Sequence, residues 1–155
     1  MMCRQQLRRV GRRHERGATM VELAISGMVF AMAMFGLLEM GRYMTTQNTL
    51  SEAARRGARY AATVGNTTAN DTAIKNMVLY RQTTAGTQPV AYGLTAASVV
   101  ITRSANFGMR AGEVTVTIQN YQFNLTIPLL GTTFTQKPIS ASANAESAGV
   151  VPGNI

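Results

Sequence analysis

The chain has 155 residues, of which 46% are hydrophobic and 14% charged, a size that fits one small domain with a tether. Its formal charge is +8, but six arginines and one glutamate before residue 18 contribute +5 of it, which leaves +3 for the rest. A phosphate-binding face needs its basic residues on the folded body, so this distribution argues against a nucleic-acid partner.

Residue types that most catalytic and metal sites require are missing after residue 17. Cys3 and His14 are the only cysteine and histidine, and both precede that point, so the remaining chain can form neither a disulfide nor a Cys/His metal site. The six later carboxylates are scattered, and the sequence has no glycine-rich phosphate loop or nucleophile elbow. We therefore expect no enzyme activity, no cofactor and no metal.

A long apolar run follows the basic segment. Residues 23–38, "LAISGMVFAMAMFGLL", include 16 positions without a charge, and Glu22 and Glu39 border them. As a helix this run is about 24 Å long, slightly less than the usual span of about 20 residues. A buried helix of a soluble core is the alternative, but such a helix should show a polar stripe, and this run is apolar on every face. The pattern favours a membrane segment.

The flanking charges predict its orientation. Short segments rich in arginine stay in the cytoplasm, so residues 1–17 should be inside and residues 43–155 outside. A small-residue cleavage motif of the secretory type does not follow the apolar run. Any cleavage should therefore occur on the cytoplasmic side.

The start of this run resembles a known processing site. The stretch "RRHERGATMVE" is similar to the cleavage site of type IV prepilins and pseudopilins, in which a basic leader ends in glycine and the mature chain has glutamate as its fifth residue. Those positions are Gly17, Ala18 and Glu22. The resemblance implies cleavage after Gly17 by a prepilin peptidase in the bacterial inner membrane.

A longer stretch resembles the TadE-like family of tight-adherence pilus systems. Its members share the "RG…VE…A" opening and an "E-x-G-R" close, which Glu39, Gly41 and Arg42 supply at the membrane edge. The later stretches "LSEAARRGARYAA" and "ISASANAES" are similar to the family with less specificity. Ser26 and Gly27 stand where the family commonly has proline, and glycine loosens a helix less than proline does.

This resemblance implies a physical role for Glu22. An ionised carboxylate in hydrocarbon is costly unless it is paired, and cleavage would create an amine on Ala18 near the same depth. In the pilin family this glutamate is thought to pair with the N-terminal amine of a neighbouring subunit. The alternatives are that Glu22 only reaches toward the membrane surface and that Gly17 is only a flexible joint.

The helix should continue beyond the membrane over residues 41–65, with Gly65 as its stop. Apolar residues at spacings of three and four define its buried face: Met44, Leu50, Ala54, Ala58, Ala61 and Ala62. Arg55, Arg56 and Arg59 form a basic patch on the same segment. This patch is either a solvated face, with Glu52 paired to Arg56, or a contact for acidic lipid or a pilus partner.

Shorter elements follow. Residues 71–82 are predicted as an amphipathic helix on Ile74, Met77, Val78 and Leu79, capped by Asn70 or Asp71. Residues 83–96 are rich in glycine, proline and threonine and break the pattern. Strands "SVVITRS" and "EVTVTIQN" flank a glycine-containing turn, and a shift in the alternation predicts a bulge or bend near Asn120.

A last strand at residues 139–147 would complete a small antiparallel sheet. We thus expect an α+β, pilin-like fold: a long N-terminal helix whose first half spans the membrane and whose second half packs on the sheet. The expected parts are a basic leader at residues 1–17, a membrane and assembly helix at residues 18–42 and an extracytoplasmic domain at residues 43–155.

The predicted function is that of a TadE-like pilin or pseudopilin, a structural or assembly subunit of a pilus. Its expected partners are the prepilin peptidase, other pilin subunits, the inner-membrane assembly machinery and the lipid bilayer, but no nucleic acid. The alternative is an unprocessed, single-pass, membrane-anchored periplasmic binding protein. The mature N-terminus separates the two hypotheses.

Overall fold

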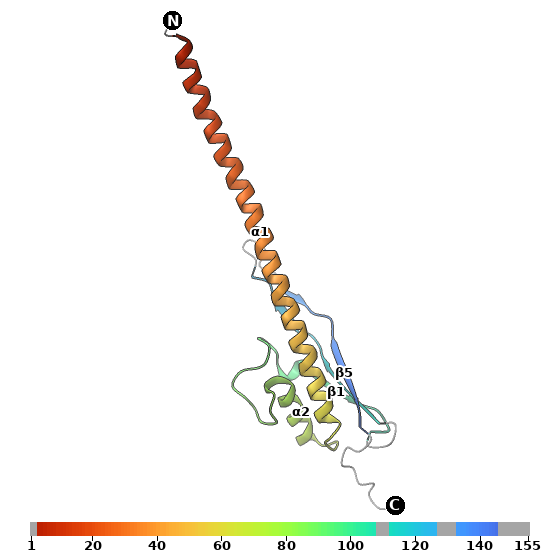
Figure 1. The fold of residues 1–155 in the computed structure, drawn as a ribbon. Coiled ribbons are helices and arrows are strands. Elements are labelled where there is room, and N and C mark those ends of the chain that lie inside the picture. The colour runs from red at the N-terminus through yellow and green to blue at the C-terminus, as the bar shows by residue number, and fades with distance from the viewer. Residues whose placement is uncertain (1–2, 108–111, 127–132, 146–155) are drawn as a thin grey trace, which may run out of the picture.

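The computed structural model describes residues 3–107, 112–126 and 133–145, with only the backbone for residues 3–16. Its elements are α1 (Cys3–Ala61), α2 (Thr68–Tyr80), the 3₁₀ turn η1 (Ala96–Ser98), β1 (Val99–Arg103), β2 (Glu113–Ile118), β3 (Gln122–Asn124), β4 (Thr133–Thr135) and β5 (Ile139–Asn144). The body gathers around the C-terminal part of α1, and the N-terminal part extends away from it as a bare rod (Figure 1). This arrangement confirms the predicted α+β layout.

The part of α1 that precedes Glu39, which we call the bare part, carries the apolar run. The large apolar side chains of the helix from Met20 to Met44 are mostly exposed to solvent. By length and composition, Gly17–Ala61 is the one helix in the described part of the chain that could cross a membrane, and none of its most apolar window, of mean hydropathy 2.0, is buried. The helix runs unbroken through Gly27.

The second part of α1 buries a face of small residues. Leu50, Ala53, Ala54, Ala58 and Ala61 are inaccessible to solvent or almost so. The short side chains of the four alanines let α2, β2 and β5 approach the helix closely. Two predictions about this segment were wrong: Met44 is 55% exposed, on a side of α1 that the described body leaves uncovered, and the helix ends at Ala61 rather than Gly65.

Helix α2 begins earlier than predicted. Its N-cap is Thr67, whose hydroxyl accepts a hydrogen bond from the Asn70 backbone amide at 3.2 Å, so the predicted caps Asn70 and Asp71 were wrong. The helix ends at Tyr80, with Arg81 in the left-handed conformation at its C-cap. Ile74, Val78 and Leu79 are buried against the core, as the amphipathic pattern predicted.

The main sheet has three antiparallel strands in the order β1-β2-β5. Val116 of the central strand lies opposite Ile101 on one side and Ala141 on the other. Alternate residues of β2, namely Val114, Val116 and Ile118, are buried toward the helices, whereas Ser140, Ser142 and Asn144 of β5 are exposed. The predicted last strand is therefore present, although it ends at Asn144 and its predicted Glu146 and Ser147 lie outside the described residues.

A second, two-stranded sheet is formed by β3 and β4, with Phe123 opposite Phe134. The predicted bend is confirmed, because Asn120 has a φ of 56°, in the left-handed region that turns the chain out of β2. The prediction of a single sheet was wrong for the same reason. The bend directs β3 away from the main sheet, and β4 then pairs with it.

We predict that Gly57→Ala destabilises the body. A Cβ at Gly57 would overlap Val78 Cγ2 of α2 and lie 3.5 Å from Val116 Cγ1, so the layers would have to separate. Overpacking of this kind costs about 1 to 3 kcal/mol of unfolding free energy. Chemical unfolding of the full-length protein in detergent measures it, because all 5 tyrosines lie in the body and report by fluorescence.

Gly41→Ala is the matched control. Nothing lies within 4 Å of a Cβ at Gly41, and alanine favours a helix over glycine by about 1 kcal/mol, so this variant should be unchanged or more stable. An equal loss of stability in both variants would contradict the close packing at Gly57.

Candidate functional site

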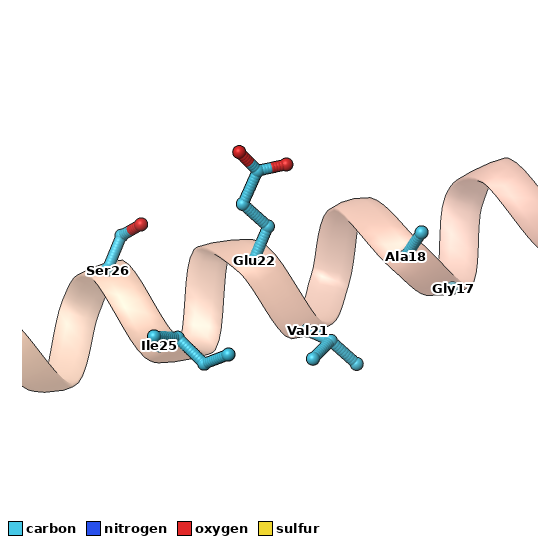
Figure 2. A pocket seen from close by; sticks show the side chains of 6 residues that line it. All are labelled: Gly17, Ala18, Val21, Glu22, Ile25 and Ser26. Carbon is cyan, nitrogen blue, oxygen red and sulfur yellow. The ribbon is translucent and has the colours of Figure 1, made fainter.

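The predicted processing residues lie in the bare part of α1. Gly17 and Ala18 are helical and precede Glu22 by one turn (Figure 2). A Cβ at Gly17 would have nothing within 4 Å, so packing in the described structure gives no reason for glycine there. A protease that binds an extended backbone would have to unwind the helix locally at this point.

Glu22 is a single carboxylate on an apolar helix surface. Its side chain projects to the same side as Ala18 and Ser26, whereas Val21 and Ile25 project to the other side (Figure 2). Val21 and Ile25 are each 60% exposed, so no part of the body covers this surface. Among the described residues, the Glu22 carboxylate has no hydrogen-bond or ion-pair partner.

The carboxylate at the other border of the apolar run is paired. Glu39 Oε2 lies 3.3 Å from Arg42 Nη2, and Glu39 Oε1 accepts a hydrogen bond of 3.3 Å from the Thr126 backbone amide. The Glu39 side chain is only 11% exposed. This pairing offsets the cost of holding a charge beside an apolar segment.

Arg42 joins the helix to the second sheet. Its Nη2 donates to the Asn124 carbonyl and its Nη1 donates to Thr126 Oγ1 at 2.9 Å. The guanidinium also lies over the Phe123 ring, 4.7 Å from the centroid. Glu39 and Arg42 therefore fasten the end of β3 to α1, and we call these two residues with Asn124 and Thr126 the clamp.

Aromatic rings support the clamp from the next position of the helix. Tyr43 packs edge-to-face on Phe123, with centroids 5.4 Å apart, and lies 5.5 Å from Phe134. Phe123 and Phe134 are themselves 5.5 Å apart. The three rings form a small cluster that links α1 to both strands of the second sheet.

The clamp borders a groove of about 360 Å³ between α1, β3 and the segment around Tyr92. Tyr121 lies in its wall, and its hydroxyl donates to the Tyr92 carbonyl at 2.9 Å. Burial raises the pKa of the Tyr121 phenol, and the nearby positive charge of Arg42 opposes that shift. At neutral pH this tyrosine is a neutral hydrogen-bond donor that ties the segment around Tyr92 to the clamp.

The structure thus separates the predicted site residues into two groups. Gly17, Ala18 and Glu22 lie at one end of the apolar run, and Glu39 and Arg42 lie at the other with a structural role that the sequence did not reveal. Asn124, Thr126 and Phe123 were missed because they are more than 80 positions away and reach Arg42 only through the fold. The alternation at Tyr121 and Phe123 was the available signal.

The third residue of the membrane-edge motif, Gly41, is exposed. A Cβ there would meet nothing within 4 Å. In the part of the chain that the structure describes, no group of three His, Cys, Asp or Glu side chains could hold a metal ion.

We predict that Arg42→Leu loosens the second sheet from α1. The change removes the ion-pair partner of the Glu39 carboxylate and the donor to the Asn124 carbonyl, which should cost about 1 to 2 kcal/mol because Arg42 is 46% exposed and its charge is partly screened. Tyrosine fluorescence during chemical unfolding measures the loss. Hydrogen exchange at the Thr126 amide should accelerate.

Arg56→Leu is the control for this prediction. Arg56 and Glu52 form an ion pair of the same type on the same helix, but their 3.9 Å contact leaves Glu52 72% exposed, and such pairs contribute at most about 0.5 kcal/mol. If both arginine variants lose the same stability and hydrogen exchange at the Thr126 amide is unchanged, the clamp does not fasten β3 to α1.

Comparisons with known proteins give a match to most of helix α1. The family model described as TadE-like protein matches residues 17–59, from the predicted cleavage glycine to the last turn of α1. No curated protein and no solved structure matches the chain. TadE-like proteins are pilus-associated structural proteins, and the matched segment contains Gly17, Glu22, Glu39, Gly41 and Arg42. Residues 17–59 therefore match the TadE-like family, as their resemblance to it predicted.

Proposed function

We propose that this chain is a pilin-like subunit that is anchored in the bacterial inner membrane by α1. A prepilin peptidase cleaves it between Gly17 and Ala18, and the processed chain then joins other subunits through the bare part of α1. The observation that carries the proposal is the Glu22 carboxylate, which has no partner among the described residues and lies on an uncovered apolar helix within the segment that matches the TadE-like family.

The bare part of α1 supports membrane insertion. The segment from Glu22 to Arg42 is about 30 Å long as a helix, which is the thickness of the hydrocarbon core of a bilayer. Its large apolar side chains point in all directions around the helix and are exposed. Such a surface is stable in lipid or against other apolar helices, but not in water.

The charges beside this segment support an orientation. Six arginines precede residue 17, and the apolar run itself has none. Segments rich in arginine are retained in the cytoplasm, so the leader would be inside and the body with its sheets outside. The clamp at Glu39 and Arg42 would then lie at the extracytoplasmic surface of the inner membrane, where it holds the body close to the bilayer.

The glycines of the bare helix support close contact with other helices. A Cβ at Gly27, Gly36 or Gly41 would meet nothing within 4 Å in the described structure. Each glycine costs a helix about 1 kcal/mol relative to alanine, and no contact in the described part of the chain repays that cost. Small residues let helices approach closely in a membrane, so neighbouring subunits supply a reason for them.

Glu22 would be paired only in the assembly. Cleavage would place the positive amine of Ala18 one turn from Glu22 in the same chain and near the same depth in any neighbour. A carboxylate without a partner is unfavourable in hydrocarbon, and a neighbour's amine removes that penalty. The charge pair would thus favour the assembled state over a single subunit in lipid.

We predict that Gly17→Val blocks processing. A side chain at this position would hinder the approach of a peptidase to the backbone, whereas the fold has open space there and should not change. Intact-mass determination of the protein from cells that carry the pilus system should find a precursor that includes Cys3 and the arginine leader. The matched control is Gly27→Val, which should still be cleaved.

The wild-type mass also tests the proposal as a whole. A mature chain that begins at Ala18 supports a processed pilin-like subunit. A wild-type chain that keeps residues 1–17 in such cells would instead favour an unprocessed, membrane-anchored binding protein. Cleavage of the Gly17→Val protein at the same bond would contradict the role given to Gly17.

We predict that Glu22→Ala separates anchoring from assembly. Removal of the carboxylate makes the run more apolar, so membrane insertion should be preserved. The neighbour's amine would lose its partner, a change that costs about 3 to 5 kcal/mol when the pair is buried. The protein should be processed and membrane-resident, yet co-purify poorly with pilus components and support little piliation.

Two further variants make this test specific. Glu22→Gln keeps the shape but not the charge and should behave like Glu22→Ala, whereas Glu113→Ala removes an exposed carboxylate of β2 and should assemble normally. The experiment needs matched expression in a strain without the wild-type copy. Normal piliation by the Glu22→Ala protein would show that the carboxylate has no pairing role.

A further inference from the structure

The outer face of α1 within the body carries a strong positive charge. Arg55, Arg56 and Arg59 project there together with Glu52, at helical spacings of three and four. Their side chains enclose a shallow hollow of about 220 Å³. We call these three arginines and Glu52 the arginine face, and it carries a net charge of +2.

Most of this charge has no counter-ion within the chain. Arg55 and Arg59 are exposed and form no ion pair with any described residue, and the Arg56–Glu52 contact is 3.9 Å long. Arg56 Nη1 is buried and has no hydrogen-bond acceptor in the part of the chain that the structure describes. The opposite side of the same turns, including Ala54 and Ala58, is buried in the core.

The arginine face continues the uncovered apolar surface of the same helix. Exposed positions at spacings of three and four connect the two: Leu37, Leu38, Gly41, Thr45, Asn48, Glu52, Arg55 and Arg59. A helix that packs along the apolar part can therefore extend onto the arginine face without crossing the body.

The position of the face along α1 argues against lipid as its ligand. Arg55 follows Arg42 by 13 residues, about 20 Å of helix, so it would lie far outside the headgroup layer when Arg42 is at the membrane surface. The attraction between exposed charges is largely screened beyond about 8 Å in physiological salt.

A second copy of the chain is also a poor match. Two copies held in one bilayer by the same apolar run lie at the same height, so three arginines of one copy would face three arginines of the other. Each copy carries only Glu52 as a compensating carboxylate on this face. Like charges opposite each other destabilise helix pairs and select a different partner.

We propose that the arginine face binds a different membrane-anchored protein whose helix packs along α1 and presents carboxylates to Arg55 and Arg59. This inference rests on the proposed assembly function and names the chemistry of the partner. The apolar part of α1 supplies adhesion to that partner, and the arginines make unlike subunits pair in preference to like ones.

An acidic copy of this chain provides a defined probe. In the variant with Arg55→Glu and Arg59→Glu, the apolar run is unchanged and carboxylates stand at the required height. Donor and acceptor dyes can be attached at Cys3, the only cysteine, in the full-length precursor. Energy transfer is then measured in vesicles of neutral phosphatidylcholine for wild-type with wild-type and for wild-type with the acidic variant.

The mixed pair should half-associate at a protein-to-lipid ratio about tenfold lower than the wild-type pair at low salt, since two exposed ion pairs replace two repulsions. The difference should disappear in 1 M salt, where the screening length is about 3 Å. The control acceptor carries Arg81→Glu and Lys137→Glu, the same charge change at exposed positions outside the face, and should associate like wild-type.

Equal association of the wild-type and mixed pairs, or equal gains with the acidic variant and the control, would overturn the inference. Chemical unfolding first verifies that both variants are as stable as wild-type. These vesicles contain no pilus component other than this chain. The result therefore tests whether the arginine face prefers a partner with carboxylates, even if the proposed function is wrong.

A measurement in cells also distinguishes failure of this inference from failure of the proposed function. The Arg55→Glu, Arg59→Glu protein should be cleaved after Gly17 like wild-type but co-purify less with other pilus components. The Arg81→Glu, Lys137→Glu protein should do both normally. Undiminished co-purification of the first variant would overturn the inference and leave the proposed function intact, whereas an uncleaved wild-type chain would contradict the proposed function.

Discussion

An apolar helix surface that the chain's own body leaves uncovered is the constraint on which the rest of this structure depends. Residues from Met20 to Met44 present large side chains on all sides of α1, and the body contacts the helix from Glu39 onward. In the described structure, the two sheets and the short α2 pack on the second part of the helix and leave this surface uncovered. The chain therefore requires an apolar environment from outside itself, either lipid or other helices.

The clamp determines where that external environment ends. Glu39 and Arg42 are the first charged residues after the apolar run, and both are bound to backbone or side-chain atoms of β3 and the residue pair that follows it. An isolated Glu39–Arg42 pair on a helix surface would contribute little. Here the carboxylate is nearly buried and the guanidinium has three further partners, so the pair fixes the second sheet against α1.

The positions of the charged residues along α1 thus reflect function as well as stability. The arginines before residue 17 and the clamp border the apolar run, where charge is expected for a helix that spans a membrane. Glu22 and the arginine face are different, because neither finds adequate compensation in the described structure. Uncompensated charges on an exposed helix are consistent with partners outside the chain, a positive amine in the first case and carboxylates in the second.

The sequence by itself determined the features that depend on local periodicity. The apolar run, the helix that contains it, the buried residues Leu50, Ala54 and Ala58, and the alternation of β2 were all predictable, because neighbours in sequence define them. The resemblance to the TadE-like family was also readable from the sequence, and the family model matches residues 17–59. The bend at Asn120 was visible as a change of phase in the alternation.

Only the tertiary structure decided which of these features meet. Arg42 reaches Asn124 and Thr126 across more than 80 positions, and no local pattern predicts such a pairing. The separate β3–β4 sheet follows from where the left-handed Asn120 directs the chain, and the need for glycine at residue 57 arises from Val78 on another helix. Met44 has the spacing of a buried residue but is exposed, since burial depends on which side of α1 the body covers, and at this level the second sheet packs on Tyr43. Periodicity specifies the face that a helix offers, and the three-dimensional arrangement of distant segments decides what covers it.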